Sequence, residues 1–133
     1  MGRQVGSRRL GGYILNEGKL SIRLRRSLFR LRAERAAMYG LITRLTAASG
    51  RRNELALMLL DPAANRRGCH HYVVALGTDG PDSLWVTEIW ISEEAHRAWV
   101  AEIRDSEVLK PALALIATWG DTIITRPLAG IGL

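Results

Sequence analysis

Three segments of the chain combine β-favouring residues with turn residues at their ends, which is the pattern of strands. They span residues 39–46, 69–76 and 84–91. Only the polar cluster from Gly77 to Asp82 separates the second segment from the third, so these two are expected to form a hairpin. A fourth and last strand is expected over residues 122–126.

Helical spacing of apolar residues follows the first and the third of these strands. After the first, apolar residues recur at helical intervals between Ser49, a candidate N-cap, and a stop at Asp61-Pro62. After the third, Ser92 offers a capping hydroxyl to a helix whose first turn is acidic. A further helical piece is expected over residues 106–119, where Pro111 must begin a new turn or bend the helix. The element order is therefore β-α-β-β-α-β, the split βαβ arrangement of ferredoxin-like α+β domains.

Residues 84–91 are mostly apolar on both faces of the predicted sheet, because alternate residues of a strand point to opposite faces. One face carries Trp85, Thr87, Ile89 and Ile91, and the other carries Leu84, Val86, Glu88 and Trp90. Helices in this topology cover one face only, so the other face needs a second apolar surface. We therefore expect a homodimer in which two sheets pack face to face.

Composition agrees with one ordinary globular domain. The chain has 133 residues, of which 47% are hydrophobic and 24% are charged. It has no apolar run of about eighteen residues, which a membrane-spanning helix needs. The single cysteine, Cys69, cannot form an internal disulfide, so we expect a reducing compartment and a cytoplasmic protein. No thiol-activating base lies near Cys69 in sequence, and we expect it to act as a small buried hydrophobic residue.

The positive charge of the chain is confined to its first part. Residues 1–37 hold ten Lys or Arg and two acidic residues, whereas residues 38–133 hold nine basic and eleven acidic residues. No nucleic-acid contact is therefore expected for residues 38–133. Residues 1–18 are rich in glycine and are expected to be disordered, and leucines at helical spacing in residues 19–37 predict a basic amphipathic helix.

Three interpretations of this basic extension, residues 1–37, stay open. It contacts an anionic membrane or a nucleic acid, it is a targeting peptide, or it is a dispensable translated stretch ahead of a true start at Met38. A secretory signal is not expected, because arginine interrupts every apolar run. The domain that carries the function is expected to span residues 38–133.

Four stretches of residues 38–133 form a distinctive set. They are Met38-Tyr-Gly-Leu-Ile-Thr-Arg-Leu, Gly68-Cys-His-His-Tyr-Val-Val-Ala, Leu84-Trp-Val-Thr-Glu-Ile-Trp-Ile-Ser-Glu-Glu-Ala-His and the closing Pro127-Leu-Ala-Gly-Ile-Gly-Leu. Together they resemble the antibiotic biosynthesis monooxygenase family, including its quinol monooxygenase branch. The resemblance implies a dimeric α+β barrel. It also implies an enzyme that oxygenates electron-rich aromatics such as hydroquinones with O2, without metal, flavin or haem.

The chemistry that this resemblance implies needs a proton acceptor and a ring-binding pocket. A deprotonated hydroquinone can itself give an electron to O2, so the protein has to bind the ring, remove a proton and exclude water. His96 is the candidate catalytic proton acceptor, since an ordinary histidine titrates near a pH of about 6.5. By the resemblance, Trp90 is the ring platform and hydrogen-bond donor, and Glu88 with Tyr72 shapes the pocket.

Each of these side chains also has a purely structural interpretation. Trp90 is then a core aromatic, Glu88 forms an ion pair with Arg44 on the neighbouring strand, and His96 lies at the surface. Tyr72 then only lines the cavity. For the whole protein, the alternative function is a non-catalytic dimer that binds a small aromatic metabolite.

Neither a metal nor haem is expected as a cofactor. His70 and His71 are adjacent on a strand, so their side chains point to opposite faces and cannot share one ion. Relatives that degrade haem look similar but use a ligating histidine in the later helix and an asparagine on the first strand. The resemblance places Leu113 and either Ile42 or Thr43 at those positions, so the axial ligand of haem is missing.

Overall fold

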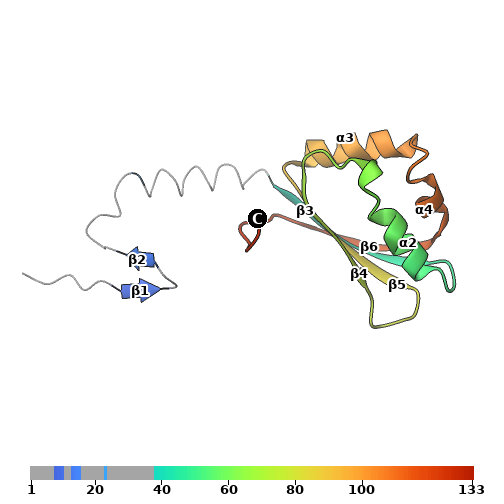
Figure 1. Cartoon of the computed structure of the whole chain (residues 1–133), viewed down its shortest axis with the longest axis horizontal. Helices are drawn as coiled ribbons and strands as arrows, with labels where there is room; N and C mark the ends of the chain where they lie inside the picture. The colour runs from blue at the N-terminus through green and yellow to red at the C-terminus, as the bar shows by residue number, and fades with distance from the viewer. Residues whose placement is uncertain (1–7, 11–12, 16–22, 24–37) are drawn as a thin grey trace, which may run out of the picture. The chain divides into compact units, whose positions relative to one another are not determined.

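The computed structural model describes residues 8–10, 13–15, 23 and 38–133 of the chain (Figure 1). The chain divides into two compact units, Met1–Glu34 and Arg35–Leu133. None of the helices in the described residues is long and apolar enough to cross a membrane.

In the first unit, the described residues include two short strands, β1 (Arg8–Leu10) and β2 (Tyr13–Leu15), which pair antiparallel. Both lie within residues 1–18, so the expected disorder is wrong for these two segments. Pairing between the strands satisfies backbone groups without a large apolar core, which composition alone does not reveal. Of the helix predicted over residues 19–37, Arg23 is helical, and the rest lies outside the described residues.

The second unit is built on a four-stranded antiparallel sheet with helices on one face (Figure 1). Its strands are β3 (Tyr39–Ala47), β4 (Cys69–Leu76), β5 (Ser83–Trp90) and β6 (Ile116–Thr125). They lie in the order β4-β5-β3-β6, so the first and third strands in sequence occupy the centre. The expected ferredoxin-like α+β topology is confirmed, and the predicted hairpin is the pair of β4 and β5.

The helices are α2 (Arg52–Leu59), the short 3₁₀ turn η2 (Pro62–Ala64), α3 (Glu93–Arg104) and α4 (Lys110–Ala114). The Ser92 cap is confirmed, since its Oγ accepts a hydrogen bond of 3.1 Å from the backbone N–H of Ala95. The Ser49 cap is wrong: α2 begins after Arg51, and no side chain caps it. Gly50 has a positive φ of 74°, and this turn delays the start of the helix.

The helix expected over residues 106–119 is wrong in its extent. Only Lys110–Ala114 is α-helical, with Pro111 in the first turn as its ring requires, and β6 already begins at Ile116. Residues of this stretch pair with β3, where Trp119 lies opposite Leu45 and Thr118 opposite Thr46. Pairing with the central strand outweighs the weak helical spacing of a short apolar stretch.

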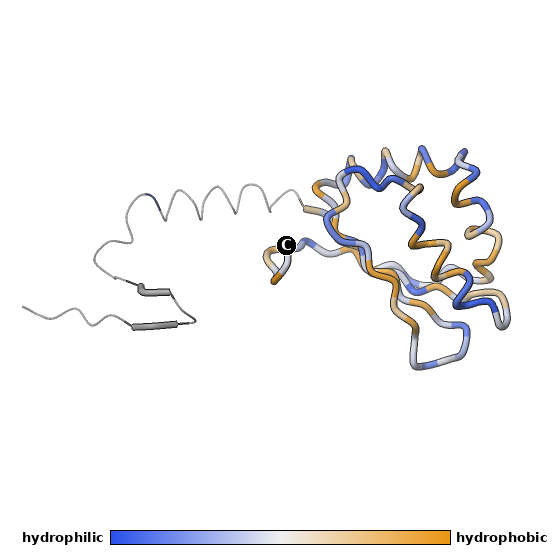
Figure 2. Tube along the Cα trace, viewed as in Figure 1, coloured by the Kyte–Doolittle hydropathy of each residue, from blue (hydrophilic) through white to orange (hydrophobic). Residues whose placement is uncertain are grey.

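The two faces of the sheet differ in what covers them. The inner face, under the helices, carries most of the core, in which Leu84 and Trp90 are fully buried. On the outer face an apolar row crosses all four strands, with Val73 beside Thr87, Thr87 beside Ile42 and Ile42 beside Ile123. Val73 is 52% exposed and Ile123 is 54% exposed. Hydrophobic colour therefore runs along the strands as well as the helices in Figure 2.

Candidate functional site

A cavity of about 400 Å³ lies between α3, α4 and the inner face of the sheet. Its walls come from β3, β4, β5, β6 and the helices, and most lining side chains are aliphatic or aromatic. The polar groups in it are few: Glu88, His96, Arg104, Tyr72 and the hydroxyls of Thr43 and Thr122. A space of this size and character is typical of a site for a small organic molecule.

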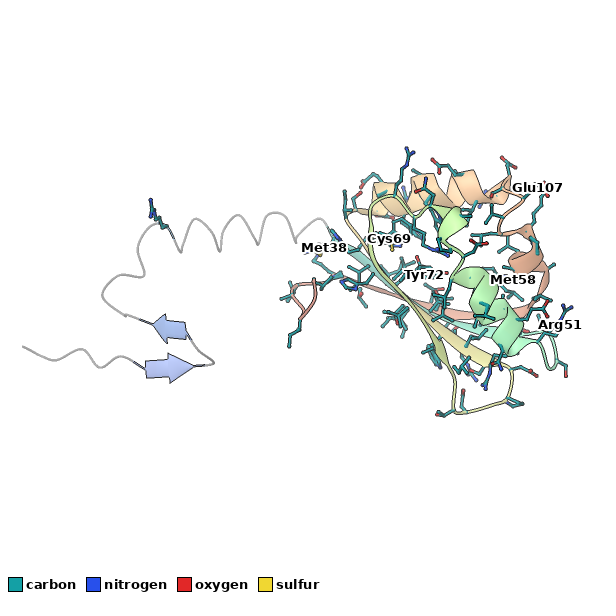
Figure 3. The ribbon with its side chains drawn as sticks, viewed as in Figure 1. Met38, Arg51, Met58, Cys69, Tyr72 and Glu107 are labelled. Carbon is teal, nitrogen blue, oxygen red and sulfur yellow. The ribbon has the colours of Figure 1, made fainter. Side chains whose placement is uncertain are left out.

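Alternation along the strands explains why Glu88 and Tyr72 face this cavity. On β5, Glu88 shares a face with buried Val86, which also lines the cavity. On β4, Tyr72 lies directly opposite Glu88 in the register, and its side chain lies between the sheet and the helices (Figure 3). The two polar groups therefore project from neighbouring strands into one apolar space.

Glu88 is a nearly buried carboxylate that has two neighbours in the site. Trp90 donates a hydrogen bond of 2.7 Å from Nε1 to Glu88 Oε2. The same oxygen lies 3.7 Å from His96 Nε2, and the Glu88 side chain is only 12% exposed. Burial raises the pKa of Glu88 above its ordinary value, while the hydrogen bond from Trp90 and the charge of Arg66 act to lower it.

His96 stands in the first part of α3, where the Ser92 cap fixes the start of the helix. Its imidazole packs between the rings of Trp90 and Tyr39, at centroid distances of 5.3 Å and 5.5 Å. The His96 side chain is 18% exposed and lines the cavity. Burial lowers the pKa of His96, and the charge of Glu93 opposes that shift. The imidazole therefore lies beside Glu88, and burial favours its neutral form.

Trp90 lies outside the cavity wall, although it belongs to the same cluster. It is fully buried, it is not among the residues that line the cavity, and its N–H is committed to Glu88. Its expected role as a ring platform for a ligand therefore does not fit this geometry. Two other tryptophans, Trp99 and Trp119, do line the cavity. Trp99 is the buried one of these two, and its Nε1 donates to the carbonyl of Ala64 at 2.9 Å. A sequence signal for Trp99 exists, because it follows His96 by three residues on one helical face.

Arg66 is a further charged residue near the site, and the sequence patterns do not reveal it. Its guanidinium carbon lies 3.9 Å from the centroid of the Tyr72 ring and 5.3 Å from that of Trp99. It also donates to the carbonyls of Leu59 and Asp61. Burial raises the pKa of Tyr72 to about 12, with a smaller contribution in the same direction from Glu88 and an opposing one from Arg66. Tyr72 is therefore a neutral hydroxyl at physiological pH.

The ion pair expected between Glu88 and Arg44 is wrong. Arg44 belongs to the outer face, where it lies opposite Trp85 in the register and stands 5.9 Å from that ring. Its guanidinium pairs with Asp79 at 2.5 Å. Glu88 lies opposite Leu41 on β3, and both residues face the inner side of the sheet. Arg44 is three positions after Leu41 on the same strand, so alternation turns its side chain to the outer face.

The paired histidines lie away from the cavity. His71 Nε2 is 2.9 Å from the carbonyl oxygen of Gly132, and His70 is exposed. Across the described residues, no group of three or more His, Cys, Asp or Glu is arranged to hold a metal ion. The Cys69 thiol donates to the carbonyl of His71 at 3.2 Å, and burial raises its pKa to about 11, which disfavours the thiolate.

Two positions bear on haem chemistry. Leu113 and Thr43 both line the cavity, whereas Ile42 lies on the outer face of the sheet. By the resemblance alone, the haem-degrading relatives carry their functional residues at Leu113 and at either Ile42 or Thr43. The side chains present at these two positions do not supply an axial imidazole ligand.

Comparison with known proteins identifies relatives of this chain. A model of the antibiotic biosynthesis monooxygenase family matches residues 38–102. A putative antibiotic biosynthesis monooxygenase from Chloroflexus aurantiacus J-10-fl is 35% identical, with a TM-score of 0.63; the match covers 71% of this chain and 96% of that one. A search of curated proteins finds no match.

Two more distant structures share the fold. A putative antibiotic biosynthesis monooxygenase from Bordetella bronchiseptica is 16% identical, with a TM-score of 0.57 and coverage of 70% of this chain and 99% of that one. SnoaB from Streptomyces nogalater, a cofactor-independent oxygenase solved as its N63A mutant, is 15% identical. Its TM-score is 0.52, and the match covers 72% of this chain and 98% of SnoaB.

Proposed function

Because the chain belongs to the antibiotic biosynthesis monooxygenase family, we propose that it oxygenates quinol-like or polyhydroxylated aromatic molecules with O2. The observation that carries the proposal is one apolar cavity that contains both the Glu88 carboxylate and the His96 imidazole. An aromatic ring fits the apolar walls, and a phenolic hydroxyl fits the polar pair.

The first step of the proposed reaction is removal of a phenolic proton by His96. The 3.7 Å between His96 Nε2 and Glu88 Oε2 exceeds a hydrogen bond, yet one hydroxyl oxygen can lie within about 2.8 Å of both atoms. The hydroxyl gives its proton to the neutral imidazole, and the adjacent carboxylate stabilises the imidazolium that forms. Trp90 acts as a positioning residue, because its N–H holds the Glu88 carboxylate in place.

The second step is electron transfer from the phenolate to O2, which this substrate class performs without a protein-bound cofactor. Taking a simple hydroquinone, one oxygen atom of O2 is added to the ring, the other leaves as water, and the product is a hydroxyquinone. Four electrons leave the substrate and reduce one O2. The apolar lining keeps bulk water from the phenolate and the oxygen intermediates, as such chemistry requires.

Oxygen uptake tests this proposal. Protein freed of metals is mixed with a panel of hydroquinones of one to three rings, and oxygen consumption is recorded against buffer and against heat-treated protein. We expect saturable uptake above both blanks for at least one compound. Stoichiometric binding of several compounds with no uptake above the buffer rate contradicts the enzyme and favours the alternative, a non-catalytic binding protein.

The pH dependence of turnover follows from the environment of His96. Burial lowers the pKa of His96, so its neutral, proton-accepting form persists to lower pH than in an exposed histidine, whose pKa is about 6.5. As the pH falls through that lowered pKa, kcat/KM should decline. We expect the acid limb of a kcat/KM profile, measured by oxygen uptake, at a pH below about 6.5. An acid limb at a pH well above about 6.5 means that a group other than His96 accepts the proton.

We also propose that the outer face of the sheet packs against a second copy of the chain. The two ends of the row of Val73, Thr87, Ile42 and Ile123 are exposed apolar side chains, Val73 and Ile123, and a twofold axis places one row on another. Val73→Glu should then set like charges face to face and halve the mass measured by light scattering. Ala98→Glu, an equal charge on an exposed helical residue, serves as the control and should stay dimeric. A dimeric Val73→Glu variant with wild-type stability contradicts this interface.

The functional domain in this proposal is residues 38–133, and the cytoplasm is its compartment because Cys69 has no internal disulfide partner. The basic extension, residues 1–37, is left outside the site. Mass spectrometry of the natively expressed protein tests this division. An N-terminus at Met38 supports it, and a native extension whose removal abolishes turnover contradicts it.

A further inference from the structure

Arg104 is a charged residue on the cavity wall with no partner in the described part of the chain. It is the last residue of α3, it is exposed, and it lines the cavity. Among residues 38–133, no carboxylate or carbonyl pairs with its guanidinium, whereas Arg97 on the same helix pairs with Glu93 at 2.7 Å. Arg104 therefore has a positive charge that is available to a ligand.

Arg104 stands where the cavity meets solvent. Together with His96 and Val100 it also borders a shallow surface pocket, which Arg97 and Ala101 complete. Of the residues that line the cavity in the described part of the chain, it is the single Arg or Lys. An anion that enters this cavity therefore meets one favourable partner, and the partner is at the rim, where its charge is not fully desolvated.

The spacing along α3 sets the distance between the two polar ends of the cavity. His96 and Arg104 are eight residues apart on one helix, which corresponds to about 12 Å along its axis. Val100 lies midway and, like both of them, lines the cavity, so one helical stripe spans it. Between the ends the lining is apolar, which suits fused rings.

We propose that the ligand of this cavity is an elongated aromatic carboxylic acid whose carboxylate binds Arg104. Its fused rings lie along the α3 stripe. This inference rests on the proposed function. In it, the hydroxyl at the end of the ligand opposite its carboxylate reaches the Glu88–His96 pair. The carboxylate accepts hydrogen bonds from a guanidinium whose geometry matches it. Arg104 is thereby a residue that determines specificity and does not touch the reacting atoms.

Binding of a probe that cannot react tests the inference without turnover. Anthracene-2-carboxylate has three fused rings and a terminal anion, and anthracene-2-carboxamide is its neutral counterpart of the same shape. Dissociation constants are measured by probe fluorescence for wild type, Arg104→Gln and, as the matched control, Arg97→Gln. Arg97 lies on the same helix and carries the same charge, but it does not line the cavity.

We expect wild type and Arg97→Gln to prefer the carboxylate to the carboxamide. Arg104→Gln should weaken carboxylate binding about tenfold, the effect of one charged hydrogen bond at a solvated rim, and leave carboxamide binding unchanged. Three results overturn the inference: equal weakening of both probes, no weakening of either, or the same loss in Arg97→Gln.

Turnover data separate this inference from the proposed function. If the probe binds through Arg104 but no hydroquinone is oxidised, the result supports the carboxylate site and contradicts the proposed monooxygenase activity. If hydroquinones are oxidised and Arg104→Gln changes neither the KM nor the dissociation constant of carboxylated compounds, the result supports the monooxygenase activity and contradicts the carboxylate site.

Discussion

Replacing His96 with glutamine is expected to lower kcat for the preferred hydroquinone by a factor of about 10² to 10⁴, the usual contribution of a general base. Glutamine keeps a polar side chain of similar reach but accepts no proton at neutral pH. The neighbouring Glu88 carboxylate, 3.7 Å away, then has no imidazolium to stabilise. Steady-state oxygen uptake over a range of substrate concentrations measures the effect.

The controls for this variant separate chemistry from folding and binding. His96 is partly buried against Trp90 and Tyr39, so thermal unfolding has to show that the variant is folded. Ligand binding, measured with the unreactive anthracene probe, should change by less than the rate. A folded His96→Gln variant with unchanged kcat removes this residue from the mechanism and leaves Glu88 as the candidate acceptor.

Truncating Trp90 to alanine is expected to cost about 3–5 kcal/mol of the free energy of unfolding, the range for removing a large buried aromatic side chain. Trp90 is fully buried and packs 5.2 Å from Trp99 and 5.3 Å from His96, as measured between ring centroids. Native domains have a free energy of unfolding of only about 5–15 kcal/mol, so this loss should leave the variant barely stable. Urea titration at constant pH measures the loss.

Trp90→Phe separates the packing role of this residue from its hydrogen bond to Glu88. Phenylalanine retains much of the buried ring but removes the N–H that lies 2.7 Å from Glu88 Oε2. Without that donor, the pKa of Glu88 should rise further, since the hydrogen bond from Trp90 acts to lower it. Turnover should then fall, because less of the carboxylate is ionised to stabilise the imidazolium.

Trp99→Phe is the matched control for this substitution. It also removes an indole N–H from a buried tryptophan, but the lost hydrogen bond goes to the carbonyl of Ala64. Its pH profile of kcat/KM should keep the wild-type shape, while that of Trp90→Phe changes. Equal changes in the two profiles mean that Trp90 is only a packing residue.

Local signals in the sequence were sufficient for much of the fold. β4 spans residues 69–76 as expected, because β-favouring residues end there at a glycine-rich turn. The start of α3 follows from Ser92 and the two acidic residues after it, which is a local hydrogen-bonding pattern. Residues 116–121 did not follow local signals, since their strand conformation comes from pairing with β3.

The inward direction of Glu88 could be predicted, but its partners could not. Alternation along β5 fixes the face of the residue, whereas the identity of its neighbours depends on how helices and loops pack on that face. Arg66, for example, reaches Tyr72 from the loop between η2 and β4, and no periodic pattern marks it. The same holds for Trp90 and Trp99: only packed side chains reveal which tryptophan lines the cavity.

Labelling with ¹⁸O2 tests the central claim most directly, because it follows the oxygen atom into the product. Metal-free wild-type protein is incubated with its preferred hydroquinone under ¹⁸O2 in ordinary water. The mass of the quinone product is measured by mass spectrometry before its oxygen atoms exchange with water. The account predicts one ¹⁸O atom per product molecule, and an amount of labelled product that falls in His96→Gln by the same factor as kcat. A product that carries no ¹⁸O, with the label found in hydrogen peroxide, contradicts it.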